Sequence, residues 1–217
     1  MKDGTEKLIG ALSEAVVPVE RLPSPAMRAA QWLGFAVLFV GALVVLRGYR
    51  ADIGARLSDV EFAIPWAASL FVAVTAAVAA FYMTVPGTPR WIVALPLAPL
   101  AVWLATLGAG CVRELSEQGL AVLGVSLDCI EFISLTSVPL AAVLVWMLRR
   151  AAPLAPSGTF AMGALAAAAA GSAGLELYHH IDTSTEALVW HVGTVGVVTL
   201  IGLSSGRRAL AVASVND

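Results

Sequence analysis

Gly163-Ala-Leu-Ala-Ala-Ala-Ala-Ala-Gly-Ser-Ala-Gly174 decides the fold, because it places small side chains on almost every face of one apolar segment. In a lipid bilayer, helices associate through close packing rather than through the hydrophobic effect, and small residues let their backbones approach. The run therefore predicts a closely packed helix within a transmembrane bundle. In the following apolar segment, Gly193, Gly196 and Gly202 suit the same purpose, and we interpret all these small residues as structural.

The whole chain has the composition of an integral membrane protein. Of its 217 residues, 59% are apolar and only 13% are charged, and the mean hydropathy is +0.86. Six segments are long and apolar enough to cross about 30 Å of hydrocarbon: residues 29–46, 62–85, 91–109, 130–148, 159–178 and 187–205. The sequence predicts an all-α bundle of six transmembrane helices, preceded by a short cytoplasmic helix.

The distribution of basic residues predicts the orientation. Six spans place both termini on one side, and a cytoplasmic N-terminus puts nine of the thirteen Lys and Arg residues inside. The remaining four are Arg47, Arg50, Arg56 and Arg113. Tryptophans stand near span ends, where indole rings prefer the membrane interface: Trp32, Trp66, Trp91, Trp146 and Trp190. We expect both termini in the cytoplasm.

A polar tail, residues 1–28, precedes the first span. Asp3 and Glu6 have the spacing of a capping box, and Pro18 ends the helix that they begin. Apolar residues follow at helical spacing: Leu8, Ile9, Leu12 and Val16. Such a short stripe needs a surface to dock on. A partner protein is favoured over lipid, because the tail carries as much acid as base. The chain thus divides into a tail (1–28), a transmembrane domain (29–206) and a second tail (207–217).

All three histidines lie around the junction of the fifth and sixth spans. Imidazole, carboxylate and thiol groups bind zinc- or copper-like ions, and the topology brings such groups to one membrane level: Cys129, Glu176, His179, His180 and His191. The alternative is that the histidines mark only the solvent-exposed end of a helical hairpin.

The chain has two cysteines. Cys111 and Cys129 either form a disulfide in an oxidising compartment or remain two structural thiols.

Four short pieces resemble the NrsF-like membrane anti-sigma factors. They are Lys7-Leu-Ile-Gly-Ala-Leu12, Pro18-Val-Glu-Arg-Leu22, Arg149-Arg-Ala-Ala-Pro-Leu-Ala-Pro156 and Val189-Trp-His191. The resemblance implies a six-span protein of the bacterial inner membrane that holds an extracytoplasmic-function sigma factor through its tail and releases it on an outer signal. The implied partner-binding residues are Leu8, Ile9, Leu12, Pro18, Val19, Arg21 and Leu22.

The chain departs from this family at one position of the expected sensor. Members typically carry one cysteine at the start of the fourth span, where Cys129 stands, and another after the fifth. His179-His180-Ile181 stands in place of the second. A dithiol switch between these positions is therefore in doubt, whereas metal binding stays open because imidazole can replace thiolate. Cys111 is the alternative redox partner of Cys129.

Other function classes fit the sequence less well. It contains no nucleophile with its base, no phosphate-binding loop and no cofactor fingerprint, so we expect a regulator rather than an enzyme. We expect membrane lipids around the bundle. We expect no direct nucleic-acid partner, because the sequence contains no long basic patch.

A small metal-ion transporter or channel is the alternative function. Its ionisable groups would have to continue across the membrane, however, and none lies mid-span. A metal-dependent membrane enzyme ranks third, because no ligand set has a defining spacing.

Overall fold

A computed structural model describes residues 2–14, 21–119, 127–151, 153, 155–178 and 183–211. Every regular element in these ranges is helical: α1 (Lys2–Glu14), α2 (Pro25–Arg47), α3 (Ile53–Ser58), α4 (Val60–Tyr82), α5 (Arg90–Ala94), α6 (Leu97–Gln118), α7 (Leu127–Arg149), α8 (Pro156–Leu175), α9 (Ser184–Glu186), the π-helix η2 (Ala187–Val192) and α10 (Gly193–Ala211). The predicted all-α class is confirmed.

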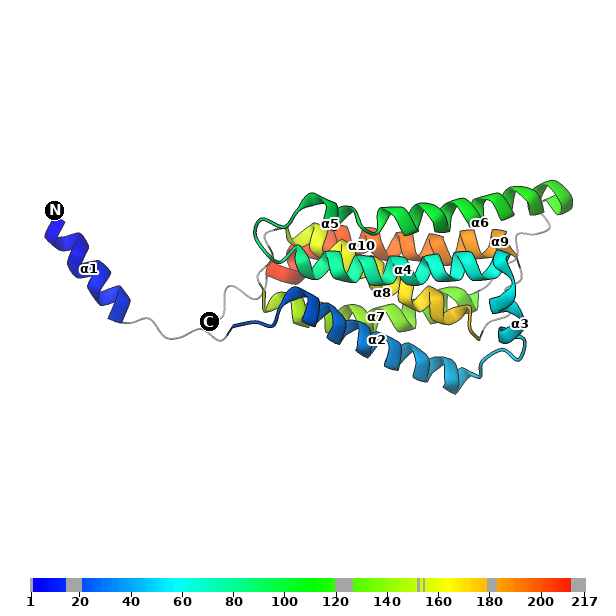
Figure 1. Ribbon diagram of the computed structural model, residues 1–217, viewed down its shortest axis with the longest axis horizontal. Helices are drawn as coiled ribbons and strands as arrows, with labels where there is room; N and C mark the ends of the chain where they lie inside the picture. The colour runs from blue at the N-terminus through cyan, green and yellow to red at the C-terminus, as the bar shows by residue number, and fades with distance from the viewer. Residues whose placement is uncertain are drawn as a thin grey trace.

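Six helical stretches of the described chain are long and apolar enough to cross a membrane, as predicted. They are Pro25–Arg47, Val60–Tyr82, Arg90–Gln118, Glu131–Arg149, Pro156–Leu175 and Ser184–Ala209. Figure 1 shows them side by side in one bundle. We call the end where α2 begins the tail end, because α1 lies beyond it. The opposite end, with α3 and α9, is the far end.

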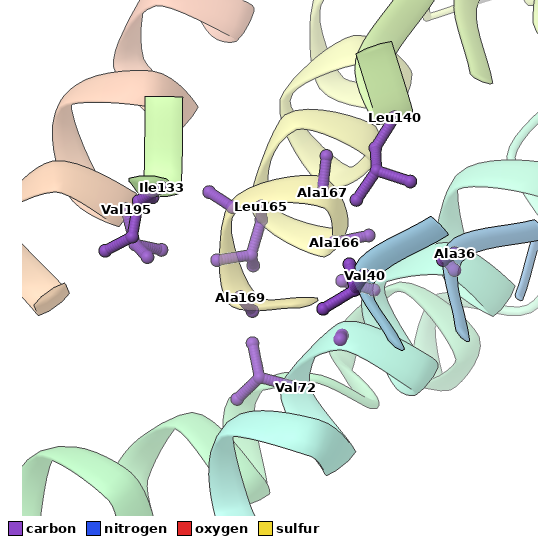
Figure 2. Packing of buried hydrophobic residues seen from close by; sticks show 14 of the residues in the cluster. Ala36, Val40, Val72, Ile133, Leu140, Leu165, Ala166, Ala167, Ala169 and Val195 are labelled. Atoms are coloured by element: carbon purple, nitrogen blue, oxygen red, sulfur yellow. The ribbon is translucent and has the colours of Figure 1, made fainter. Parts of the chain in front are cut away.

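The alanine-rich helix α8 is the centre of the bundle. Of its most apolar stretch, 78% is buried, against 22–44% for the other five spans. Helices α2, α4, α7 and α10 all pack on it, and Figure 2 shows Leu165, Ala166, Ala167 and Ala169 surrounded by aliphatic side chains from all four. Because the alanines are so short, these neighbours approach from every side, as the composition of the segment predicts.

Glycines make the closest of these contacts. A Cβ at Gly202 of α10 would lie 2.7 Å from the Cβ of Ala164, and one at Gly206 would lie 2.7 Å from the Cα of Ser157. On α8 itself, a Cβ at Gly171 would lie 2.3 Å from Oγ1 of Thr136 in α7. A real Cβ could not fit at such distances without movement, so these positions fix how closely α7, α8 and α10 pack.

The third span differs from the prediction at both ends. It is broken at Leu95 and Pro96 between α5 and α6, because proline provides no N–H donor and ends α5. It also continues to Gln118 instead of ending near 109, and Gly119 stops it with a φ of 63°. Cys111 and Arg113 therefore belong to a helix and not to a connector. The short helix α3 was likewise not expected.

Of the tryptophans predicted to mark the membrane interface, Trp32 is buried inside the bundle and Trp66 is partly buried. Trp32 is fully buried, and its Nε1–H donates to the carbonyl of Leu140 at 3.0 Å. Trp66 donates to the carbonyl of Ala173 at 3.1 Å, one of the carbonyls that the end of α8 leaves without a helical partner. Trp91 and Trp146 are 64% and 57% exposed, in keeping with an interfacial position.

Candidate functional site

A cavity of about 110 Å³ opens at the far end of the bundle. It lies where α3, α4, α6, α8, α9 and η2 meet. Charged side chains of both signs line it, together with one histidine: Arg56, Asp59, Glu61, Arg113, Glu114, Glu176 and His191. Sequence reasoning predicted two of these residues, Glu176 and His191, as parts of a sensor at this end.

His191 belongs to the π-helix η2 and is fully buried. Its Nδ1 lies 3.1 Å from Oγ of Ser172 and 3.5 Å from Oε1 of Glu176. The Glu176 side chain is only 10% exposed, so the three polar groups lie together in a largely dry environment. A one-turn π-helix commonly occurs at functional positions because it redirects side chains relative to the surrounding α-helix.

Helix α6 holds the element that carries His191. Glu114 accepts the backbone N–H groups of Ser184 and Thr185 at 2.7 and 2.9 Å, and the hydroxyl of Thr185 at 2.7 Å. A carboxylate is favourable at a helix N-terminus, where N–H groups lack helical partners. Gly110 allows this approach, because a Cβ there would lie 2.1 Å from Oγ of Ser184.

The four far-end arginines all have carboxylate partners. Arg113 makes two hydrogen bonds of 2.9 Å to Glu61, and Arg47 lies 3.4 Å from Glu131. The buried Arg50 donates to Asp52 at 2.7 Å, with Arg56 3.4 Å from the same carboxylate. The hydrogen bond from Arg50 is the main reason that the pKa of Asp52 lies well below its usual range.

Of the predicted metal and redox residues, the structure brings two into contact. These are Glu176 and His191, described above. His179 and His180 lie outside the described residues, as does the side chain of Cys129, although its backbone belongs to α7. Cys111 is a half-buried free thiol in α6. In the described part of the chain, no group of three or more His, Cys, Asp and Glu residues is arranged to hold a metal ion.

The predicted partner-binding stripe lies on α1. Leu8, Ile9 and Leu12 are 60%, 58% and 61% exposed, and Figure 1 shows α1 clear of the bundle. Arg21 and Leu22, which follow, are also exposed, whereas Pro18 and Val19 lie outside the described residues. Within the described residues, nothing covers this apolar face.

A buried arginine anchors the point where the tail meets the bundle. The guanidinium of Arg28, near the start of α2, lies 5.0 Å from the ring centroid of Phe81 and donates to Oγ1 of Thr84 at 3.4 Å. It also donates to the carbonyl of Met147, one of the last in α7. One side chain thus joins the tail-end termini of α2, α4 and α7.

Sequence reasoning missed Ser172, Arg113 and Glu114. Ser172 and Glu176 have the i,i+4 spacing that places two residues on one helical face, but Ser172 was interpreted only as a small packing residue. Arg113 and Glu114 lie past the end of the most apolar stretch. The run from Arg113 to Gln118 nevertheless consists mainly of good helix formers, which is the signal that could have extended the helix.

Comparison with known proteins gives one match. The family model described as "Negative regulator of sigma F" (NrsF) matches residues 12–211, which include Leu12 of the stripe but not Leu8 or Ile9. No curated protein and no solved structure matches the chain. Because the family match runs over nearly the whole sequence, from the tail through all six spans, the chain belongs to the NrsF family of negative regulators of sigma F.

Proposed function

We propose that the chain is a membrane-bound anti-sigma factor that sequesters an extracytoplasmic-function sigma factor through its N-terminal tail. It acts in the bacterial inner membrane with both termini in the cytoplasm. The exposed stripe of Leu8, Ile9 and Leu12 carries this proposal, because a helix of 13 residues that stands clear of its own bundle gains most of its stability by docking. Membership of a family of sigma-factor regulators supports the choice of partner.

The position of the tail suits this role. Arg28 holds the start of α2 against α4 and α7, so the tail joins the bundle at a fixed point. A movement of α2, α4 or α7 would therefore alter where the tail begins. We propose that this is how an event in the bundle reaches the bound sigma factor.

The signal in this proposal is a metal ion or an oxidant acting at the far end, which faces the periplasm. Cys129, His179 and His180 receive it, with Glu176 and His191 as supporting groups and Cys111 as the alternative redox partner. The contact between Glu176 and His191 supports a shared site, since it joins the end of α8 to the start of the sixth span. Zinc- or copper-like ions suit imidazole, thiolate and carboxylate ligands.

Repression in cells tests the proposed output. A reporter that depends on the candidate sigma factor is compared in cells with the full chain and in cells with a chain lacking residues 1–20, which retains Ser24, the N-cap of α2. The truncated chain should reach the membrane in equal amount and no longer repress. Full repression by the truncated chain would show that the tail does not hold the sigma factor.

A further inference from the structure

The arginines at the two ends of the bundle differ in whether a carboxylate lies near them. At the far end, each arginine lies within 2.7–3.4 Å of a carboxylate oxygen. At the tail end, the described residues of the bundle include no Asp or Glu, and exposed arginines have no carboxylate partner there: Arg90, Arg149, Arg150, Arg207 and Arg208. The described part of the bundle's tail end therefore carries a net positive charge.

Four of these arginines gather where α7 and α10 end. Nε of Arg149, the last residue of α7, donates at 2.8 Å to the carbonyl of Ala209 in the last turn of α10. This bond brings the end of α7, which carries Arg149 and Arg150, against the last turns of α10, which carry Arg207 and Arg208. All four side chains are exposed. We call these four residues the arginine corner. Its formal charge of four positive units has no described carboxylate to offset it.

An exposed tryptophan marks the depth of the arginine corner in the membrane. The guanidinium of Arg150 lies 4.1 Å from the ring centroid of Trp146, and Trp146 is 57% exposed. Exposed indole rings at the ends of spans sit at the level of the lipid headgroups. A guanidinium that lies over such a ring is held at that same level.

We propose that the arginine corner binds the phosphate headgroup of an anionic phospholipid. Guanidinium groups match phosphate oxygens with paired hydrogen bonds, and basic pockets between transmembrane helices commonly hold anionic headgroups. The stacking of Arg150 on Trp146 favours lipid over a protein partner, because it fixes one of the four charges at headgroup depth. The ligand differs from the partner of the tail and from any signal at the far end.

Lipid binding to the purified full chain tests this site. The chain is reconstituted in phosphatidylcholine nanodiscs and titrated with fluorescent phosphatidylglycerol or cardiolipin, and with fluorescent phosphatidylcholine as the uncharged comparison. The anionic lipids should bind and phosphatidylcholine should not. Arg150→Gln should weaken binding of the anionic lipids about fivefold, as expected for one arginine near a membrane surface. Soluble glycerol phosphate should not displace them, because it lacks the chains that keep the headgroup at this depth.

Arg90→Gln is the matched control, because Arg90 is also exposed at the tail end beside an exposed tryptophan, Trp91, but lies in α5. The affinity of this variant for the anionic lipids should stay within twofold of that of the parent. A paired change, Arg207→Gln with Arg208→Gln, removes charge while keeping the bond from Arg149 to Ala209, and should weaken binding more than Arg150→Gln. Unchanged affinity in Arg150→Gln and in the paired variant, or equal losses in Arg90→Gln and Arg150→Gln, would overturn the proposal. If Arg150→Gln or the paired variant lost capture of the sigma factor but still bound the anionic lipids as the parent does, the lipid proposal would be overturned. The arginine corner would then bind an acidic protein surface instead.

Discussion

Glu114 in α6 and Thr185 in α9 are joined by two hydrogen bonds, of 2.9 Å from the backbone N–H and 2.7 Å from the hydroxyl. The two residues are 71 positions apart. The contact ties the end of the third span to the start of the sixth, directly before the π-helix that carries His191. The geometry of the far-end cavity therefore depends on a residue outside the predicted sensor.

Glu114→Ala should lower the thermal stability of the purified protein. The change removes three hydrogen bonds and leaves N–H groups at the start of α9 without an acceptor, at a cost of about 1–3 kcal/mol. Glu117→Ala is the control, because Glu117 is an exposed carboxylate of the same helix and makes none of these hydrogen bonds to α9. Unfolding in detergent, followed by circular dichroism, measures the difference. Equal melting temperatures for the two variants would contradict this role of Glu114.

Gly206→Ala should destabilise the bundle, whereas Gly196→Ala in the same helix should not. A Cβ at Gly206 would lie 2.7 Å from the Cα of Ser157 and 2.9 Å from the carbonyl oxygen of Pro156, and backbone atoms cannot move aside cheaply. Overpacking of this kind costs about 1–3 kcal/mol. Nothing lies within 4 Å of a Cβ at Gly196, where alanine favours the helix. Melting temperatures of the two variants are compared in one detergent. A higher melting temperature for Gly206→Ala than for Gly196→Ala would show that α8 and α10 pack less closely than the distances at Gly206 indicate.

Much of the fold could be predicted because a bilayer imposes strong rules on length and composition. The six spans and the central position of the small-residue helix α8 both follow from such rules. The prediction for Trp32 was wrong, because a position near a span end does not reveal which way a side chain faces. The role of Glu114 could not be predicted, since the residues that it binds lie far away in the chain.

The orientation of the bundle predicts where fused reporters work. Both termini should be cytoplasmic, because the unbalanced arginines are at the tail end and the far-end arginines are paired with acids. A periplasm-active phosphatase fused after Asp217 should be inactive, and one inserted after Gln118, where α6 ends, should be active. The reverse pattern would invert the topology and remove the proposed anti-sigma role.

The proposed sensor predicts two variants that repress but no longer respond. Cys129→Ser, and His179→Ala combined with His180→Ala, should keep the reporter silent when cells meet zinc, copper, cadmium or an oxidant. In the parent, a coupling of about 1–3 kcal/mol between signal and sigma binding would change sigma release by roughly 5- to 150-fold. If both variants respond to every stimulus as the parent does, the sensor lies elsewhere, and Cys111→Ser is the next variant to test.

The affinity of the reconstituted full chain for its sigma factor tests the central claim most directly. Leu12→Asp places a charge on the stripe of α1, where burial of a leucine is worth about 1.5–3 kcal/mol, so the dissociation constant should rise at least tenfold. Lys7→Gln, which changes the charge of the same helix by the same amount on its opposite face, is the control and should bind within twofold of the parent. Equal dissociation constants for Leu12→Asp and Lys7→Gln would contradict the claim that the apolar face of α1 holds the sigma factor.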